Sequence, residues 1–137
     1  MFPTTEELKG VTEEDFKKCG VGFRARYLKH AVEDILNNKV DIKNIERINT
    51  EKLKKNLLNI MGVGPKVADC ILLFSCKRKE VFPIDVWVRR VMNDLYIHKE
   101  DEKNVSKKEI LKLANDKFGN LEGIAQQYLF YWRRELG

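Results

Sequence analysis

The chain has 137 residues, carries 26 Lys and Arg against 21 Asp and Glu for a formal net charge of +5, and is 43% hydrophobic. Intrinsic disorder is excluded, because a folded chain of this length buries roughly two-thirds of its unfolded surface and needs neither a disulfide nor a structural metal. The longest apolar run, residues 67–76, contains Asp69 and is far shorter than the roughly 20 residues that span a bilayer. With no basic and apolar leader at its start, the sequence predicts a single cytoplasmic domain, residues 1–137, without a membrane segment.

The cysteines and the net charge narrow the function only slightly. The three cysteines are odd in number and include no C-x-x-C pair, which favours reduced thiols in a core over a disulfide frame or a zinc site. The isoelectric point of about 9.1 permits an anionic partner, but a modest charge spread over one domain is a weak indication of nucleic-acid binding. Composition alone therefore leaves the function open. The cysteines are Cys19, Cys70 and Cys76.

Apolar residues recur at spacings of three and four along most of the chain, and this period predicts an all-α fold, with about seven to nine helices. Thr4 and Thr12 each precede acidic residues, as the N-caps of two short helices do. Longer helices are expected over residues 27–36, 50–58, 65–76, 86–96, 107–118 and 121–136. The last of them carries an apolar face made of Ile124, Ala125, Tyr128, Leu129 and Trp132.

The most informative segment is an apolar helical pattern that stops at Gly62-Val63-Gly64 and restarts at Pro65. Gly62 suits a left-handed C-terminal conformation, Gly64 allows close backbone approach, and Pro65 suits the first position of a helix. The pattern therefore predicts a helix, a tight hairpin and a second helix over about residues 51–77.

Such a hairpin exposes backbone amides that can bind DNA. Amides at a helix N-terminus, together with the positive end of the helix dipole, bind a phosphate without reading the base sequence. A plain helical turn with two glycines explains the short Gly-x-Gly pattern equally well. The predicted phosphate-binding residues are Gly62, Val63, Gly64 and Lys66.

Two further residues add chemistry to the hairpin. Lys66 lies in the first turn of the second hairpin helix, where the dipole and partial burial would favour the neutral amine, the form that attacks carbon and forms a Schiff base. Asp85 follows the apolar residues 81–84 and precedes a helix, so it is an expected N-cap within reach of Lys66. The alternatives are a solvated surface lysine and a carboxylate that only caps a helix.

Several blocks of the sequence resemble one family. Residues 62–70, Gly-Val-Gly-Pro-Lys-Val-Ala-Asp-Cys, are similar to the hairpin and nucleophile segment of the helix-hairpin-helix DNA glycosylases, and residues 82–86, Phe-Pro-Ile-Asp-Val, to the segment that bears their catalytic aspartate. Residues 22–28 and 125–130 resemble two further helices of that family. The stretch 66–70 resembles the 8-oxoguanine DNA glycosylase/AP lyase type in particular, since branches without lyase activity do not carry this lysine.

The resemblance implies a helical catalytic domain that removes 8-oxoguanine from duplex DNA through a lysine Schiff base and cleaves 3′ to the abasic site by β-elimination. Lys66 would be the nucleophile, and Asp85 the carboxylate that stabilises positive charge on the sugar. Cys70, Gln126 and Phe130 would form the base pocket, with Gln126 bonding the Watson–Crick edge of the base. Ordinary core packing is the alternative for Cys70 and Phe130.

The resemblance also implies a monovalent cation, Na⁺ or K⁺, held by the backbone carbonyls of Ile60, Met61 and Val63, with no catalytic metal or cofactor required. The partner it implies is duplex DNA that contains oxidised guanine or an abasic site. Arg24 and Arg26 stand near a helix start, where pairing with local acids is slightly favoured over phosphate binding.

The sequence departs from the family pattern in two ways. The match begins almost at Met1, whereas family members carry a further N-terminal portion, so we expect self-association or a complementing N-terminal portion to cover the apolar helical faces. Trp87 stands where eukaryotic relatives place a histidine, which indicates a prokaryotic source.

Three functions remain open at this point. The first is the glycosylase/lyase described above. Because the N-terminal portion helps to select the base in the family, a lyase-only remnant is a variant of this function. The second is a non-catalytic helix-hairpin-helix DNA-binding module, which would bind duplex DNA in a salt-sensitive way without a covalent intermediate. The third is an interaction fragment whose apolar helical faces await a partner.

Overall fold

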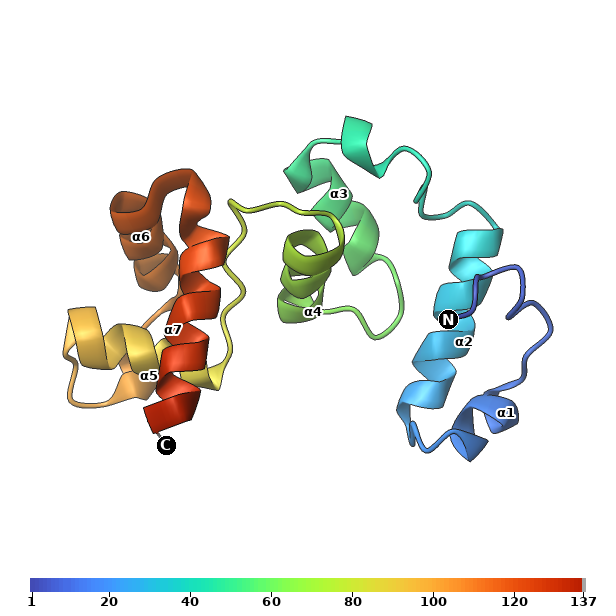
Figure 1. The fold of residues 1–137 in the computed structure, drawn as a ribbon, viewed down its shortest axis with the longest axis horizontal. Coiled ribbons are helices and arrows are strands. Elements are labelled where there is room, and N and C mark those ends of the chain that lie inside the picture. Colours follow the sequence, from blue (N-terminus) through green and yellow to red (C-terminus); the bar gives the residue numbers. More distant parts are fainter. Residues whose placement is uncertain (137) are drawn as a thin grey trace. The chain divides into compact units, whose positions relative to one another are not determined.

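The part of the chain that the structure describes is helical. The computed structural model covers residues 1–136, and within them it contains seven α-helices, short 3₁₀ and π turns, and no strand. The all-α prediction is therefore confirmed. None of the described helices is long and apolar enough to cross a membrane. The α-helices are α1 (Glu13–Lys18), α2 (Arg24–Leu36), α3 (Thr50–Leu58), α4 (Pro65–Cys70), α5 (Val86–Met92), α6 (Lys107–Phe118) and α7 (Glu122–Leu136) (Figure 1).

Several helices continue through short turns of a different pitch. The π turn η2 (Ile71–Ser75) extends α4, the π turn η3 (Asn93–Ile97) extends α5, and the 3₁₀ turn η5 (Gly119–Leu121) joins α6 to α7. Residues 1–136 thus form 6 continuous helical stretches and 2 separate 3₁₀ turns, slightly fewer helices than the seven to nine expected. The sequence pattern predicted neither separate turn, η1 (Ile45–Arg47) nor η4 (Glu102–Asn104).

Local hydrogen bonds set the starts of α1 and α3. Thr12 and Asp15 form a reciprocal capping box, in which the Thr12 hydroxyl accepts from the Asp15 N–H and the Asp15 carboxylate accepts from the Thr12 N–H. The Asn49 side chain accepts from the Lys52 N–H at 2.8 Å and caps α3. These short-range bonds explain why both helices begin where the sequence predicts.

The prediction of a short helix that begins after Thr4 is wrong. Residues 5–10 form turns, with one α-type bond from the Leu8 N–H to the Thr4 carbonyl at 3.1 Å. The Thr4 hydroxyl and the Glu7 carboxylate bond each other, so the capping chemistry is present without a helix. Gly10 takes φ +84° and ends the segment before a second turn can form, and one turn alone is too short to be stable.

The helices group into two compact units, which we describe separately. The first unit is residues 1–68, and the second begins at Asp69. In the first unit, α1 packs beside α2 (Figure 1). The apolar stripe of α2 is largely open, since Tyr27 and Leu28 are 37% and 39% exposed. The buried apolar residues of the first unit are Ala25, Val40, Leu53, Leu57, Ile60 and Ala68.

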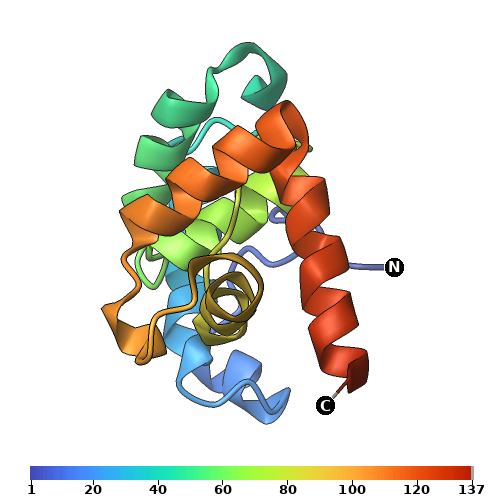
Figure 2. The same ribbon diagram turned by 90° about the vertical axis from the view of Figure 1, so that its left-hand side faces the viewer.

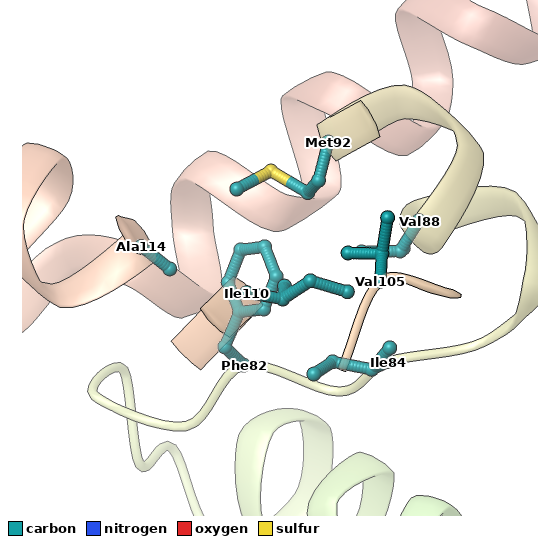
Figure 3. Packing of buried hydrophobic residues seen from close by; sticks show 7 residues of the cluster. All are labelled: Phe82, Ile84, Val88, Met92, Val105, Ile110 and Ala114. Carbon is teal, nitrogen blue, oxygen red and sulfur yellow. The ribbon is translucent and has the colours of Figure 1, made fainter. Parts of the chain in front are cut away.

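The second unit contains an apolar core in which Phe82 and Ile84, from the segment before α5, meet side chains of α5 and α6 (Figure 3). Leu129 and Phe130 of α7 are partly buried against this core. The chain turns from α6 into α7 at Gly119, which has φ +55° (Figure 2). The same core therefore positions both the start of α5 and the middle of α7. The other core members are Val88, Met92, Val105, Ile110 and Ala114.

The buried face of α7 differs from the apolar face expected from the sequence. The helix buries Gly123 and Gln126 instead of its most apolar side. The reason is a tertiary contact, because the Gly123 N–H donates to the Lys79 carbonyl at 2.8 Å and so turns this side of α7 toward the segment before α5. The residues expected on the packed face but found exposed are Ile124, Tyr128 and Trp132.

Glu122, the first residue of α7, is buried beside this contact. Its Oε2 atom has no hydrogen-bond partner within residues 1–136. Burial raises the pKa of the Glu122 carboxyl above its ordinary value of 4.5, and the negative charge of Glu80 raises it further. The charged form of Glu122 is therefore disfavoured in the folded protein.

We predict that Gly123→Ala destabilises the second unit. A Cβ at this position would overlap the carbonyl oxygens of Val81 and Lys79, which belong to the backbone and cannot rotate away. The expected loss is about 1–3 kcal/mol in the free energy of unfolding, the usual cost of overpacking, measured by urea denaturation. Gly64→Ala is the control, because a Cβ there meets nothing within 4 Å. Equal effects of the two substitutions would contradict close packing at Gly123.

We also predict that Glu122→Gln stabilises the protein more at about pH 7.5 than at about pH 4. A raised folded-state pKa means that the stability linked to the Glu122 proton is complete below the unfolded value near 4.5 and is lost as the pH rises through the folded pKa. The uncharged glutamine avoids this loss. Urea midpoints of both proteins at the two pH values test the prediction, and a pH-independent difference would disprove it.

Candidate active site

The hairpin between α3 and α4 has the predicted geometry. Gly62 takes φ +84°, the left-handed conformation that ends a helix. The Val63 N–H donates to the Ile60 carbonyl at 3.1 Å and closes the turn. The Ala68 N–H donates to the Gly64 carbonyl at 2.9 Å, which places Gly64 at the start of α4. The positive end of the α4 dipole therefore lies at the hairpin.

An aromatic ring of α2 lies directly behind Gly62. A Cβ on Gly62 would come within 2.5 Å of the Tyr27 Cγ, so no side chain larger than hydrogen fits there. The Tyr27 ring meets the Phe23 ring edge to face, with centroids 6.2 Å apart, and the Arg24 guanidinium lies 5.4 Å from the Phe23 centroid. The sequence did not predict this support, because Gly62 signalled backbone freedom and Tyr27 belonged to an apolar stripe.

Lys66 is the second residue of α4 and is exposed. The expected partial burial of this lysine is therefore wrong. Its position in the first turn after the hairpin is as predicted.

The cysteines are thiols, and they differ in environment. Cys19 is exposed, so the expected core position is wrong for it, whereas Cys70 and Cys76 are partly buried. Burial raises the pKa of the Cys76 thiol, against a smaller opposing effect of the positive charge on Arg78. Cys70 follows Lys66 by four residues in α4 and therefore lies one turn further along the same side of the helix.

Asp85 caps α5, as the sequence predicts. Its Oδ1 accepts from the Val88 N–H at 2.8 Å, and its own backbone is extended. The preceding residues Phe82 and Ile84 are buried in the core of the second unit. The core on one side and the helix cap on the other thus hold the carboxylate in a defined place.

Gln126 ties α7 to the segment that leads to Asp85. The side chain is 5% exposed, its Nε2 donates to the Pro83 carbonyl at 3.1 Å, and its Oε1 accepts from the Gln127 amide. This structural use of the amide was not predicted. The role of Gln126 in reading a base stays a prediction.

A hollow of about 350 Å³ opens in the second unit and is lined by Trp87 of α5 together with Phe130, Arg133 and Arg134 of α7. We call it the Trp87–Phe130 hollow. The sequence analysis treated Trp87 only as a departure from the family pattern. The sequence pattern did not reveal the hollow, because its lining residues come from two helices that meet only through tertiary packing.

The predicted site residues fall into two groups. The hairpin residues and Lys66 belong to the first unit, whereas Cys70, Asp85, Gln126 and Phe130 belong to the second. Gln126 donates to the segment before Asp85, and Phe130 follows Gln126 by one turn of α7. One contact between α7 and this segment therefore positions all three residues. A meeting of Lys66 with Asp85 stays a prediction.

The hairpin offers backbone carbonyl oxygens to a cation, at Ile60, Met61 and Val63. The Ile60 carbonyl already accepts from the Val63 N–H, but a carbonyl oxygen has a second lone pair for an ion. Carbonyl oxygens are the donors that hold monovalent cations in proteins. Among the described residues, no group of three His, Cys, Asp or Glu side chains is arranged to hold a metal. A bound Na⁺ or K⁺ at the carbonyls of the hairpin stays a prediction.

The structure thus combines a glycine hairpin that leads into a helix beginning Pro-Lys with an aspartate that caps a later helix, in an all-helical chain. A family profile described as "HhH-GPD superfamily base excision DNA repair protein" matches residues 1–118. The chain therefore belongs to this family.

Three similar proteins extend the comparison. The chain is 38% identical over 123 residues to the "Probable N-glycosylase/DNA lyase" of Methanothermobacter thermautotrophicus, a match that covers 90% of this chain and 38% of that protein. It is 45% identical to the 8-oxoguanine glycosylase/lyase of Clostridium acetobutylicum, solved with duplex DNA containing cytosine opposite 8-oxoguanine, with a TM-score of 0.86 over 98% of this chain and 45% of that chain. It is 41% identical to MBOgg1, solved with a low-affinity DNA ligand, with a TM-score of 0.91 over 100% of this chain and 46% of that chain. The chain thus spans less than half the length of these relatives.

We predict that Asp85 stabilises the start of α5 through its N-cap hydrogen bond and not through its negative charge. Asp85→Ala should cost about 0.5–2 kcal/mol in the free energy of unfolding, because the Val88 N–H loses its acceptor. Asp85→Asn should change it by less than about 0.5 kcal/mol, because an amide oxygen also caps a helix. Urea denaturation measures both values. The same loss in both variants would show that the charge, rather than the cap bond, stabilises the start of α5.

Proposed function

We propose that this chain is a DNA glycosylase and AP lyase that removes 8-oxoguanine from duplex DNA and cleaves 3′ to the abasic site by β-elimination. The observation that carries the proposal is Lys66, which stands in the first turn after the hairpin of a chain from a base excision repair family. The similarity to the 8-oxoguanine glycosylase/lyase of C. acetobutylicum supports 8-oxoguanine as the substrate.

The hairpin is the proposed contact with the DNA backbone. Gly62, Val63 and Gly64 bring backbone amides and the positive end of the α4 dipole to one surface, and Lys66 adds a charge beside them. Contacts of this kind fix the position of the protein on the duplex without selecting a sequence. The net charge of +5 favours the same partner.

The chemistry begins with extrusion of the damaged nucleotide, because C1′ is out of reach of a lysine while the base is stacked. Loss of one proton from the Lys66 ammonium frees the lone pair of Nζ. This lone pair forms a bond to C1′, and the C1′–N9 bond breaks with its electron pair on the departing base, which takes up a proton. The amine loses a proton, and the sugar ring then opens at the C1′–O4′ bond. The nitrogen lone pair forms the C=N bond of a protonated Schiff base as O4′ takes up a proton.

The Schiff base makes strand cleavage chemically possible. Its positive nitrogen acidifies the C2′–H bond, so a proton leaves C2′ and the electron pair moves into the carbon chain. The electron pair from C2′ then forms a C2′=C3′ double bond as the C3′–O bond breaks, and the 3′ phosphate departs with the electron pair of the C3′–O bond. One lysine therefore accounts for both base removal and strand cleavage.

Asp85 is the proposed carboxylate partner of this reaction. A negative charge near the sugar stabilises the positive charge that develops at C1′ as the base leaves. The N-cap bond to the Val88 N–H holds the side chain in one orientation, so little reorganisation is needed during the reaction. Asp85 thus combines a structural and a chemical role.

Cys70 and Phe130 are the proposed walls of the base pocket, and Gln126 is the proposed partner of the base edge. The Gln126 amide is already bonded to the Pro83 carbonyl and to Gln127. Pairing with a base therefore needs an exchange of one of these bonds, which reduces the net gain.

The proposal extends to ions, partners and location. Na⁺ or K⁺ at the carbonyls of Ile60, Met61 and Val63 would stiffen the hairpin, and lysine chemistry requires no cofactor. The exposed apolar faces of α2 and α7 would be covered by self-association or by a complementing N-terminal portion. The proposed setting is the nucleoid in the cytoplasm of a prokaryote.

Borohydride trapping tests the proposal. The protein is incubated with a duplex that carries 8-oxoguanine opposite cytosine and with a duplex that carries an abasic site, and borohydride reduces any Schiff base to a stable adduct. We expect an adduct with both duplexes, because Lys66 attacks C1′ in each, and an adduct at background level for Lys66→Gln. The adduct is measured by its retarded migration on a denaturing gel.

Lys112→Gln is the matched control, because it removes the same charge from an exposed position on α6. This variant should form the adduct as the unmodified protein does. An adduct with the abasic duplex alone would identify a lyase without base selection. No adduct with either duplex, while salt-sensitive duplex binding persists, would replace the enzyme with a non-catalytic DNA-binding module.

A further inference from the structure

The buried face of α7 is mostly polar. It consists of Glu122, Gly123 and Gln126. The Gly123 N–H donates to the Lys79 carbonyl at 2.8 Å, and the Gln126 Nε2 donates to the Pro83 carbonyl at 3.1 Å. In contrast, the buried Oε2 atom of Glu122 has no hydrogen-bond partner within residues 1–136. The contact between α7 and residues 79–83 therefore buries one carboxyl oxygen that no hydrogen bond compensates.

The two charge states of Glu122 fit this contact unequally. The residue is 7% exposed, and an ionised carboxylate that is buried without a partner loses more free energy than one hydrogen bond supplies. Burial and the negative charge of Glu80 both raise the pKa of the carboxyl group. The α7 dipole favours the charge, but no backbone N–H donates to the buried Oε2. The buried position therefore suits the neutral carboxyl group.

A hollow of about 290 Å³ beside Gly123 offers the ionised carboxylate a different environment. Lys77, Lys79 and Gln127 are among the residues that line it. Both lysines are exposed, so their charges are in contact with water. A Glu122 carboxylate that turns toward this hollow gains water and two positive charges.

Other charged residues near α7 do not replace Glu80 in this balance. The helices α5 and α6 pack against α7. The charged residues of α6 are all exposed, and α5 carries the partly buried Arg89 and Arg90. Arg90 bonds Glu102 at 2.8 Å. The causes that raise the pKa of Glu122 are burial and Glu80, and these residues of α5 and α6 are not among them.

A displacement at Glu122 reaches Gln126 through the first turn of α7. Gln126 follows Glu122 by four residues and lies one turn further along the same side of the helix. Between them, Gly123 approaches the backbone so closely that a Cβ would lie 2.4 Å from the Val81 carbonyl oxygen. A shift of this turn away from residues 79–83 therefore lengthens the hydrogen bonds of both Gly123 and Gln126.

We propose that Glu122 is a positioning residue for Gln126: its neutral form holds the Gln126 amide on the Pro83 carbonyl, and its ionised form frees that amide for the edge of a base. The proposal rests on the proposed function for the base that Gln126 binds. The carboxyl group gives its proton to water, and Glu122 itself touches neither the base nor the sugar. Selection of the base therefore strengthens as the pH rises through the midpoint of Glu122.

Nuclear magnetic resonance tests the release of Gln126 without DNA. The backbone N–H of Gly123 and the side-chain amide of Gln126 are followed in isotope-labelled protein from about pH 4 to about pH 8. We expect both signals to shift with one shared midpoint above 4.5, the ordinary pKa of a glutamate. A shift of the Gly123 signal alone, or no shift of either signal, would overturn the proposal.

Three variants assign the transition to its cause. Glu122→Gln should abolish it, because glutamine does not ionise. Glu80→Gln should lower its midpoint, because a negative charge that disfavours ionisation is removed. Glu135→Gln is the matched control, because it removes an exposed carboxylate further along α7 and should leave the midpoint unchanged. A transition that survives Glu122→Gln would belong to another group and contradict the role of Glu122.

Duplex DNA tests the consequence for the base, in a Lys66→Gln background so that no covalent step follows. Dissociation constants are measured for a duplex with 8-oxoguanine opposite cytosine and for a duplex with a tetrahydrofuran abasic analogue, which has no base edge. The preference for the duplex with the base should rise about three- to ten-fold from about pH 5 to about pH 8, the contribution of one hydrogen bond.

The same variants serve as controls for this preference. Glu122→Gln should keep it at its low-pH value, whereas Glu135→Gln should behave as the Lys66→Gln background does. A loss of stability alone would weaken binding of both duplexes and leave their ratio unchanged. An identical pH dependence of the ratio with and without Glu122→Gln would overturn the proposal.

The two proposals fail separately. A Lys66-dependent adduct together with pH-independent signals of Gly123 and Gln126 would overturn the role of Glu122 and leave the lyase in place. Signals that titrate with Glu122, without any trapped adduct, would overturn the lyase and support the positioning of Gln126 by Glu122.

Discussion

The second unit depends on the contact between the first turns of α7 and the backbone of residues 79–83. The Gly123 N–H and the Gln126 side chain donate to two carbonyls of this segment, at 2.8 and 3.1 Å. The contact requires glycine, since a Cβ would overlap the backbone carbonyls. Because Asp85 follows this segment by two residues and Phe130 lies one turn beyond Gln126, one contact positions both the candidate carboxylate and Phe130. The chemistry proposed for this unit therefore rests on a close backbone approach rather than on its apolar side chains alone.

The hairpin of the first unit uses a glycine in a similar way. Gly62 supplies the left-handed turn, and the space that its side chain would occupy is taken by the ring of Tyr27. The ring restricts the turn from one side, and the Val63 to Ile60 hydrogen bond closes it from within. Lys66 is exposed, but its backbone still has a defined position, because the hairpin fixes that position without burial of the side chain.

The sequence predicted the parts of this fold that local chemistry controls. The caps at Thr12 and Asp85 act within three residues, so a short pattern contains all the information they need. The helix expected at Thr4 failed despite similar capping bonds, because Gly10 leaves room for only one turn. The buried face of α7 and the Trp87–Phe130 hollow were missed because they depend on contacts between segments that are distant in sequence. A periodic apolar pattern predicts which face of a helix is apolar, but it does not indicate that a glycine must pack against a backbone carbonyl.

The proposed function includes two separate tasks, the covalent reaction at the sugar and the selection of the damaged base. A lysine acts on the sugar of any flipped nucleotide, so the proposed covalent step does not by itself distinguish a lesion. Discrimination needs hydrogen bonds to the base edge, and the Gln126 amide is largely used in holding α7. Under the proposed function, pairing of Gln126 with a base edge therefore requires an exchange of one of its two hydrogen bonds.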